Sequence, residues 1–261
     1  MKIPEKLASF ATVLTETVQP SLIINGTIEN TDITDHKFAG NPYWLNEIPY
    51  PTTDEGIPLR LLAQINFEKI STPIPDFPTE GILQFFVEND DVYGLNFDDQ
   101  TMQSSFRVIY HERIETDHSK LLEDFPSFSD DDYFPIPKEC ALSFKETSEP
   151  VSTNDYRFNK VTNLHSLFDE GKYDEYDELT NEYTKLYNGQ GSKIGGYPFF
   201  TQEDPRAYGQ HTDLDVLLLQ IDTDDSLGIM WGDSGVANFF ISRENLKKRD
   251  FSKVLYNWDC Y

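Results

Sequence analysis

The chain has 261 residues, of which 38% are hydrophobic and 14% aromatic, so it can bury a substantial core and is not a disordered acidic chain. Lys and Arg number 21 against 46 Asp and Glu, which gives a formal net charge of −25. This charge repels phosphate backbones and anionic membranes, so we expect neither nucleic acid nor a membrane among its partners.

The first predicted element is an amphipathic helix over 4–19. Leu7, Phe10 and Leu14 recur at helical spacing, and Pro20 ends the pattern.

The remaining pattern is mostly β. Alternating or continuous apolar runs predict strands over 60–67, 82–88, 104–114, 138–146, 215–222, 236–241 and 253–258.

A second helix is predicted over 163–187, where apolar side chains recur at helical spacing and "DEGKYDEYDEL" forms the solvent face. The pattern lacks the regular strand–helix alternation of a parallel α/β fold. The predicted fold class is therefore mainly β (α+β), built from duplicated β-rich units with a few peripheral helices.

The duplication is visible in three blocks that recur in the same order. "HKFAGNPYW" matches "SKIGGYPFF", "LRLLAQINF" matches "DVLLLQIDT", and "GILQFFV" matches "GVANFFI". We expect one domain over 1–261 made of two similar β-rich repeats, about 21–146 and 147–261. The segment 145–160 is the expected join between them.

The N-terminus has no apolar run of signal-peptide length, and no window of the chain approaches the ~18 apolar residues of a transmembrane helix. The two cysteines, Cys140 and Cys260, are far apart and lack the spacing of a redox or metal motif. These features predict a cytoplasmic protein with reduced thiols.

The stretch "WGDSG" (231–235) resembles the surroundings of the nucleophile in trypsin-like proteases. In the first repeat only Gly81, the equivalent of Gly235, and the following strand persist. Asp and Ser before Gly are typical of a tight turn, and none of the five His lies in a recognisable catalytic context. We therefore predict that Ser234 is a turn residue and assign no catalytic residue.

The acidic stretch "DTDDSLG" (222–228) superficially resembles a calcium loop. An EF-hand needs Gly at the sixth position, where Leu227 stands, and it lies between helices rather than strands. The stretch predicts a hairpin turn, and we assign neither a metal site nor a cofactor.

Two pairs of polar residues occupy equivalent places in the repeats. Lys37 and Lys193 precede a Gly-x-Pro-aromatic turn, where they could bind an anion in a shared cleft or cap loops through carbonyl groups. Gln64 and Gln220 lie inside apolar strands, so each amide needs partners, and we expect each to hold a neighbouring loop. A symmetric polar site between the halves is the alternative for this pair.

The second repeat carries polar residues that the first lacks. With an aromatic wall they could line a small-molecule pocket of both charge signs, and the alternative is a solvated loop with an internal Asp204–Arg206 ion pair. The candidate ligand-binding residues are Asp204, Arg206, His211, Asp213, Trp231 and Asp233.

Six segments resemble the YwqG-like proteins of bacteria, a family of unknown function: "KFAGNPYW", "LLAQINF", "GILQFFV", "KIGGYPFF", "IMWGDSGVANFFI" and "NWDCY". The resemblance covers nearly the whole chain. It implies a mainly β, internally duplicated fold and supplies no catalytic residues. Because some such proteins are encoded near secreted-toxin and immunity genes, it also makes a toxin-linked role plausible.

The functional expectation is a non-catalytic binding protein whose acidic face holds a basic protein partner, in the manner of an immunity protein. Acidic runs at Asp130–Asp132 and on the predicted helix steer such a partner, and Tyr133, Phe134, Tyr173 and Tyr176 are the candidate aromatic anchors. The alternative is an enzyme or small-molecule-binding protein that uses a pocket in the second repeat. The oligomeric state stays open.

Overall fold

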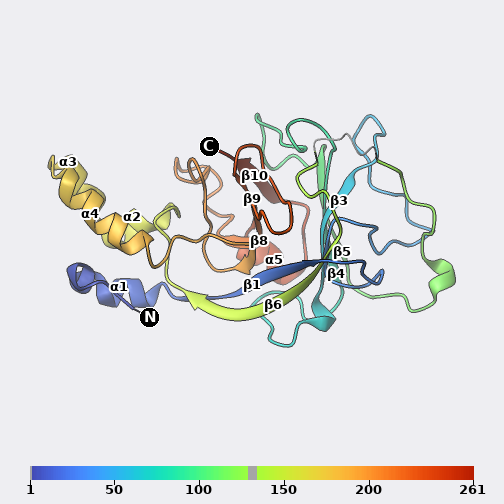
Figure 1. Cartoon of the computed structure of the whole chain (residues 1–261), viewed down its shortest axis with the longest axis horizontal. Helices are drawn as coiled ribbons and strands as arrows, with labels where there is room; N and C mark the ends of the chain where they lie inside the picture. Colours follow the sequence, from blue (N-terminus) through green and yellow to red (C-terminus); the bar gives the residue numbers. More distant parts are fainter. Residues whose placement is uncertain (1, 129–133) are drawn as a thin grey trace.

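A computed structural model of the chain describes residues 2–128 and 134–261. Within these residues ten antiparallel strands form one sheet (Figure 1). The strands are β1 (Gln19–Ile28), β2 (Lys37–Phe38), β3 (Arg60–Asn66), β4 (Ile82–Val87), β5 (Phe106–His111), β6 (Cys140–Glu149), β7 (Lys193–Gly195), β8 (Val216–Asp222), β9 (Val236–Ile241) and β10 (Val254–Asp259). The fold is mainly β, as the sequence predicts.

The helices are short. They are the 3₁₀-helices η1 (Glu5–Phe10), η2 (Phe67–Lys69) and η3 (His118–Lys120), and the α-helices α1 (Ala11–Glu16), α2 (Arg157–Thr162), α3 (His165–Asp169), α4 (Tyr173–Thr184) and α5 (Arg243–Lys248). None of the described helices is long and apolar enough to cross a membrane.

The order of the strands is symmetric about the central β1–β6 pair. It runs β10-β9-β8-β7-β1-β6-β2-β3-β4-β5, so β7 to β10 mirror β2 to β5. The leading strands are exchanged: β1 precedes β2 in sequence but pairs with β7, and β6 precedes β7 but pairs with β2. The repeat boundary expected at 146/147 lies inside β6.

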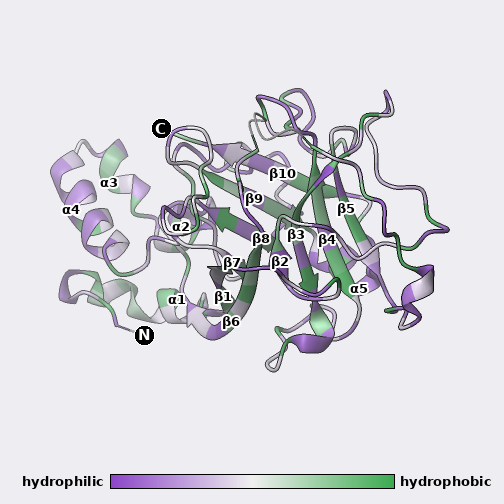
Figure 2. Ribbon diagram, turned by 45° about the vertical axis from the view of Figure 1, so that its right-hand side comes forward, coloured by the Kyte–Doolittle hydropathy of each residue, from purple (hydrophilic) through white to green (hydrophobic). Residues whose placement is uncertain are grey.

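The sheet curls until its two ends meet. Phe85 of β4 packs on its own equivalent, Phe239 of β9, at 4.9 Å between ring centroids. The loop between β4 and β5 joins the far edge strand β10, because the Tyr256 amide donates to the Gln100 carbonyl at 3.0 Å and the Trp258 indole donates to the Val92 carbonyl at 2.7 Å. The result is a nearly closed barrel with hydrophobic strands around its core (Figure 2).

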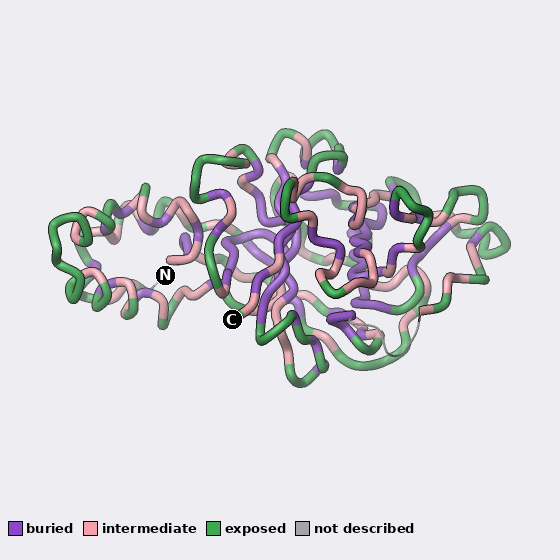
Figure 3. Tube along the Cα trace, turned by 90° about the horizontal axis from the view of Figure 1, so that it is seen from above, coloured by how far each residue is buried: buried purple, intermediate pink, exposed green. Residues whose placement is uncertain are grey.

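Helices α2 to α4 and the N-terminal η1 and α1 form a separate projection at one end of the sheet, here called the helical lobe (Figure 1). It has a small core of its own, which includes Leu7, Leu14, Phe158, Leu164 and Tyr183. Seen from above, buried residues concentrate in the sheet, whereas much of the lobe is exposed (Figure 3).

The helix predictions were too long. The predicted helix over 4–19 begins as 3₁₀ and ends at Glu16, since Gln19 already starts β1. The predicted helix over 163–187 is broken into α3 and α4 at Gly171, whose φ of +75° is left-handed and interrupts the helical path.

Candidate functional site

The Gly-Asp-Ser-Gly stretch is the turn that the sequence predicts. Ser234 is exposed, with φ of +56°, just before β9. A Cβ on Gly235 would lie 2.0 Å from the Asp259 carbonyl, and one on Gly81 would lie 2.3 Å from the His111 carbonyl. The glycine therefore recurs because two backbones meet there, and not because a nucleophile needs it.

The acidic stretch 222–228 also forms a turn. The Asp224 carboxylate accepts hydrogen bonds from the Ser226 amide at 2.9 Å and the Ser226 hydroxyl at 2.6 Å, and Asp224 bridges to Ile229 across the turn. Over 2–128 and 134–261, no cluster of three or more His, Cys, Asp or Glu side chains is placed to hold a metal ion.

The paired glutamines are fully buried, and each fastens the loop beside its strand. The Gln64 Oε1 accepts from the Tyr43 amide at 2.7 Å, while its Nε2 donates to the Ile33 and Asp35 carbonyls, each at 2.9 Å. Gln220 makes the same pattern of contacts, with Phe199, Gly189 and Gly191. These are the loop contacts expected of a buried amide, and they leave neither glutamine facing a site between the halves.

The paired lysines are buried in ion pairs. The Lys193 ammonium lies 2.7 Å from Glu149, and the Lys37 ammonium lies 3.4 Å from Glu139 and donates to the Asn41 carbonyl at 3.1 Å. Burial lowers the pKa of both lysines, although the glutamates oppose this shift. Each lysine thus anchors its own turn rather than lining a shared cleft.

Asp204 and Arg206 form the ion pair of the alternative interpretation, but it is buried instead of solvated. The Arg206 side chain is 0% exposed and donates to Asp204 at 2.8 Å and 2.9 Å and to Asp155 at 3.1 Å. Its guanidinium lies 3.8 Å from the centre of the Phe240 ring. This arrangement ties the loop after β7 to the segment that leads into α2.

The sequence did not point to Asp155 and Arg157, which complete this cluster. Arg157 donates to Asp155 at 2.7 Å. Burial alone would raise the pKa of Asp155, but the hydrogen bond from Arg157 and the charges of Arg206 and Arg157 outweigh it and hold that pKa below its usual value. A D-x-R spacing in both 155–157 and 204–206 was the available signal.

The other four candidate ligand-binding residues do not converge with this pair. Trp231 is fully buried in the barrel core, against Tyr93 and Trp258. Asp233 is exposed beside the chain end, and exposed Asp213 pairs with Lys253 at 3.1 Å. His211 sits half-buried in the loop before β8. The residues therefore do not build one pocket with Trp231 as its wall.

A cavity of about 750 Å³ does open beside Asp204, between the helical lobe and the loop at 202–208. Lys160 and His165 line one side, and Glu203 and Tyr208 line the other. The Oδ1 of Asn159, also in this lining, is buried without a hydrogen-bond partner among the described residues.

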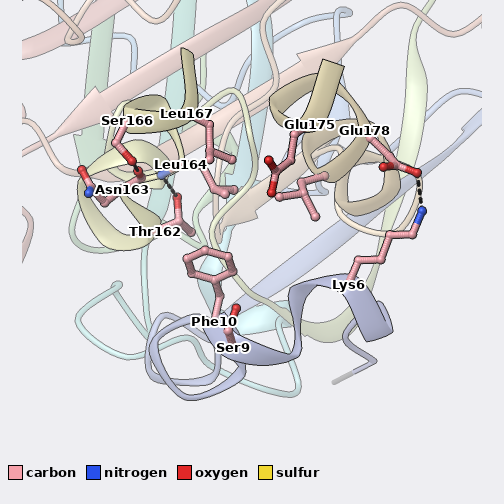
Figure 4. A pocket seen from close by; sticks show the side chains of 11 residues that line it. Lys6, Ser9, Phe10, Thr162, Asn163, Leu164, Ser166, Leu167, Glu175 and Glu178 are labelled. Carbon is pink, nitrogen blue, oxygen red and sulfur yellow. Dashed lines mark hydrogen bonds and ion pairs between the residues drawn. The ribbon is translucent and has the colours of Figure 1, made fainter. Parts of the chain in front are cut away.

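A second cavity, about 530 Å³, lies within the helical lobe, between η1 and helices α2 to α4 (Figure 4). Its apolar surface comes from Phe10, Leu164, Leu167 and Leu179. The Lys6–Glu178 ion pair crosses the lobe at one end. This cavity is here called the lobe groove.

The turn between α3 and α4 exposes two aromatic rings among acidic side chains. Phe168 is 45% exposed, Tyr173 is 52% exposed, and their ring centroids are 4.6 Å apart. This pair is here called the aromatic tip. Residues 165–184 carry seven acidic side chains against a single Lys, so the surroundings of the tip are strongly negative.

The remaining candidate anchors differ from the expectation. Tyr176 is half-buried, in contact with His165 and Phe168. Phe134 was expected to be an anchor, but it is buried against the Arg60 guanidinium, 4.1 Å from its ring centre. The run Asp130–Asp132 and Tyr133 lie outside the described residues.

Comparison with known protein families gives one match. The model of a domain of unknown function, DUF1963, matches residues 36–260, which is most of the chain and leaves out η1, α1 and β1. No curated protein matches the chain. The chain therefore belongs to the DUF1963 family, whose function is unknown.

Proposed function

We propose that this protein is a non-catalytic binding protein that holds a basic protein partner against the acidic face of its helical lobe, in the manner of an immunity protein that holds a toxin. The observation that carries the proposal is the aromatic tip. Phe168 and Tyr173 expose their rings at the end of a projecting helical hairpin, away from the barrel core.

The physical argument joins two features of the hairpin. Exposed large aromatic rings gain free energy when a partner covers them, and Tyr and other aromatic residues are common anchors of protein interfaces. The surrounding acidic side chains attract a positively charged surface and accelerate its encounter. A partner with a basic rim and a small apolar depression satisfies both features at once.

The proposal includes a setting. The segments quoted above resemble the YwqG-like proteins, and from this resemblance we infer a bacterial, cytoplasmic protein with reduced Cys140 and Cys260, which form no disulfide. In that setting the charge of −25 is consistent with an acidic protein that binds and neutralises a basic toxin domain.

A second candidate function is a small-molecule site in the cavity beside Asp204. The orphaned Asn159 Oδ1 favours it, because a buried acceptor without a donor is costly and a bound N–H or O–H group would satisfy it. Lys160 and Glu203 would offer both charge signs to such a ligand. A metabolite screen by thermal shift tests this alternative.

The test of the main proposal is capture from a lysate of the source cells. We expect the wild-type protein to recover a stoichiometric basic protein at about 50 mM salt and to lose it progressively toward about 500 mM, as ions screen the charges. The double variant Phe168→Ala/Tyr173→Ala should lose the partner at every salt concentration.

The matched control is Phe97→Ala, which removes a 74% exposed ring from the loop between β4 and β5. It should bind like the wild type. If the double variant captures as much partner as the control does, the aromatic tip is not the binding surface.

A further inference from the structure

We propose that the lobe groove receives a long cationic side chain, Arg or Lys, from the basic partner, and that Glu175 binds its charged head. The inference rests on the proposed function and specifies the chemistry by which the partner is recognised. It is carried by the shape of the groove, the nature of its walls and the position of one carboxylate.

The walls of the groove are apolar and built from separate segments of the chain. Leu164 and Leu179 in its lining are buried, and Phe10 and Leu167 are half-buried. Figure 4 shows Leu164, Leu167 and the Phe10 ring facing the space between η1 and the helices. About 530 Å³ is more than one side chain occupies, so an extended residue can enter together with part of its backbone.

A carboxylate points into this apolar space. Figure 4 shows the Glu175 side chain directed toward Leu164 and Leu167, across from the Phe10 ring. Among the described residues its carboxylate makes no hydrogen bond or ion pair, whereas Glu178 next to it already pairs with Lys6. Glu175 is thus the acidic group of the groove that remains available to a ligand.

These walls select one class of side chain. A neutral apolar ligand would displace water from the Glu175 carboxylate without offering a hydrogen-bond donor in its place, which costs free energy. An anion would be repelled by the carboxylate. A Lys or Arg side chain matches the site at both ends, because its aliphatic stem covers apolar surface while its head pairs with a carboxylate. The Phe10 ring adds a face on which a cation is stabilised.

The groove lies close to the aromatic tip along the chain. Leu167 lines the groove and Phe168 belongs to the tip, so consecutive residues of α3 serve the two surfaces. A partner held by the tip therefore has its neighbouring basic side chains within reach of Glu175.

The test uses n-butylguanidinium, a small mimic of the Arg side chain, titrated into the full-length ¹⁵N-labelled protein and followed by NMR. We expect saturable shifts of the amides of Phe10, Leu164, Leu167 and Glu175. Guanidinium, which lacks the stem, and n-butanol, which lacks the charge, should each bind at least about tenfold more weakly.

Two variants test the two parts of the site. Glu175→Gln should weaken n-butylguanidinium binding about tenfold, since it replaces a charge-assisted pair by a neutral one, while Asp174→Asn, one residue away and outside the groove lining, should not. Ser9→Trp, at the exposed rim, should fill the groove and abolish the shifts, while Ala8→Trp should leave them intact.

The outcomes separate this inference from the proposed function. If n-butylguanidinium causes no localised shifts, or if Glu175→Gln binds it as the wild type does, the groove inference is wrong, even where the aromatic tip still captures a basic protein. If the groove binds n-butylguanidinium but no basic partner is captured at low salt, the proposed function is wrong while the cation site stands.

Discussion

The glycines that recur in both repeats mark places where backbone meets backbone. Gly81 and Gly235 stand at the same step before β4 and β9, and any side chain there would strike a carbonyl of the neighbouring strand, His111 in one repeat and Asp259 in the other. Asp233 and Ser234, which lie between Gly232 and Gly235, have no such constraint. This contrast explains why the glycine is repeated and the Asp-Ser pair is not.

We predict that Gly235→Ala lowers the free energy of unfolding by about 1–3 kcal/mol, because the new methyl group overlaps the Asp259 carbonyl. Ser234→Ala, one residue earlier and exposed, should change it by less than about 0.5 kcal/mol. Urea unfolding of both variants tests this. Equal stabilities would contradict the close-approach explanation.

Two buried histidines make the protein sensitive to acid. Burial lowers the pKa of His36 and of His111 to about 4, against 6.5 for an exposed imidazole. Between these values the unfolded chain takes up protons that the folded chain does not, so stability falls as pH drops from 6.5 toward 4. At pH 5 each histidine accounts for on the order of 2 kcal/mol of the loss.

The check is urea unfolding at pH 7 and pH 5. In the wild type the Asn66 amide donates a hydrogen bond to His36 Nδ1 at 3.1 Å. His36→Asn keeps an acceptor for this amide and removes the titrating group. We expect the variant to lose less stability between the two pH values than the wild type does. Parallel losses would show that His36 is not a source of the acid sensitivity.

The buried Arg206 cluster makes a separate prediction. Arg206→Met leaves Asp204 and Asp155 with fewer partners in a buried site, so it should destabilise the fold by about 3–5 kcal/mol. Arg243→Met, which breaks a half-exposed pair with Asp76, should cost no more than about 1 kcal/mol. Comparable thermal shifts in the two variants would refute a structural role for the cluster.

At the scale of the elements, the exchanged leading strands join the repeats. β1 runs between β6 and β7, and β6 runs between β1 and β2, so each repeat contributes its first strand to the other side of the sheet. A fragment that contains one repeat loses a strand from the middle of the sheet and exposes backbone groups and apolar side chains there.

We therefore predict that residues 1–139 and 140–261, expressed separately, are each insoluble or poorly folded. Refolded together, they should recover a cooperative transition, because every strand of the described sheet is then present. Far-ultraviolet circular dichroism and size-exclusion chromatography measure this. A soluble half that melts cooperatively on its own would show that the repeats are independent units.

The sequence predicted the strands whose apolar runs are continuous, such as β4 and β9, since a strand buried on both faces has few polar interruptions. It missed β1, in which Asn25-Gly26 has the composition of a hairpin turn, and it missed β2 and β7, which are too short to show a period. The strand exchange depends on β1, so it could not be foreseen.

The candidate site was predicted less well than the strands. Asp204 and Arg206 do form an ion pair. The other candidates were grouped with them because they lie in the same part of the sequence, and such proximity does not bring side chains together in the fold. Trp231, for example, is buried in the barrel core. The lobe groove escaped notice because Phe10 and Glu175 are far apart in sequence and meet through the packing of η1 on α2 to α4. No local pattern encodes such a contact.

At the scale of the whole molecule, packing and charge are divided between two regions. The barrel contains most of the buried apolar side chains and the paired Lys and Gln contacts that fasten its loops. Much of the helical lobe is exposed (Figure 3). It is acidic over 165–184 and carries the aromatic tip and the lobe groove. The barrel thus supports the lobe, which carries the surface that we propose for partner recognition.

The most direct test of this account places a photo-crosslinking amino acid at Tyr173, with the same residue at Phe97 as the matched control, in the cells from which the sequence comes. The account predicts one dominant adduct with a basic protein from position 173, reduced when the cells are lysed into high salt before irradiation, and none from position 97. The same adducts from both positions, or an acidic protein at position 173, would contradict it.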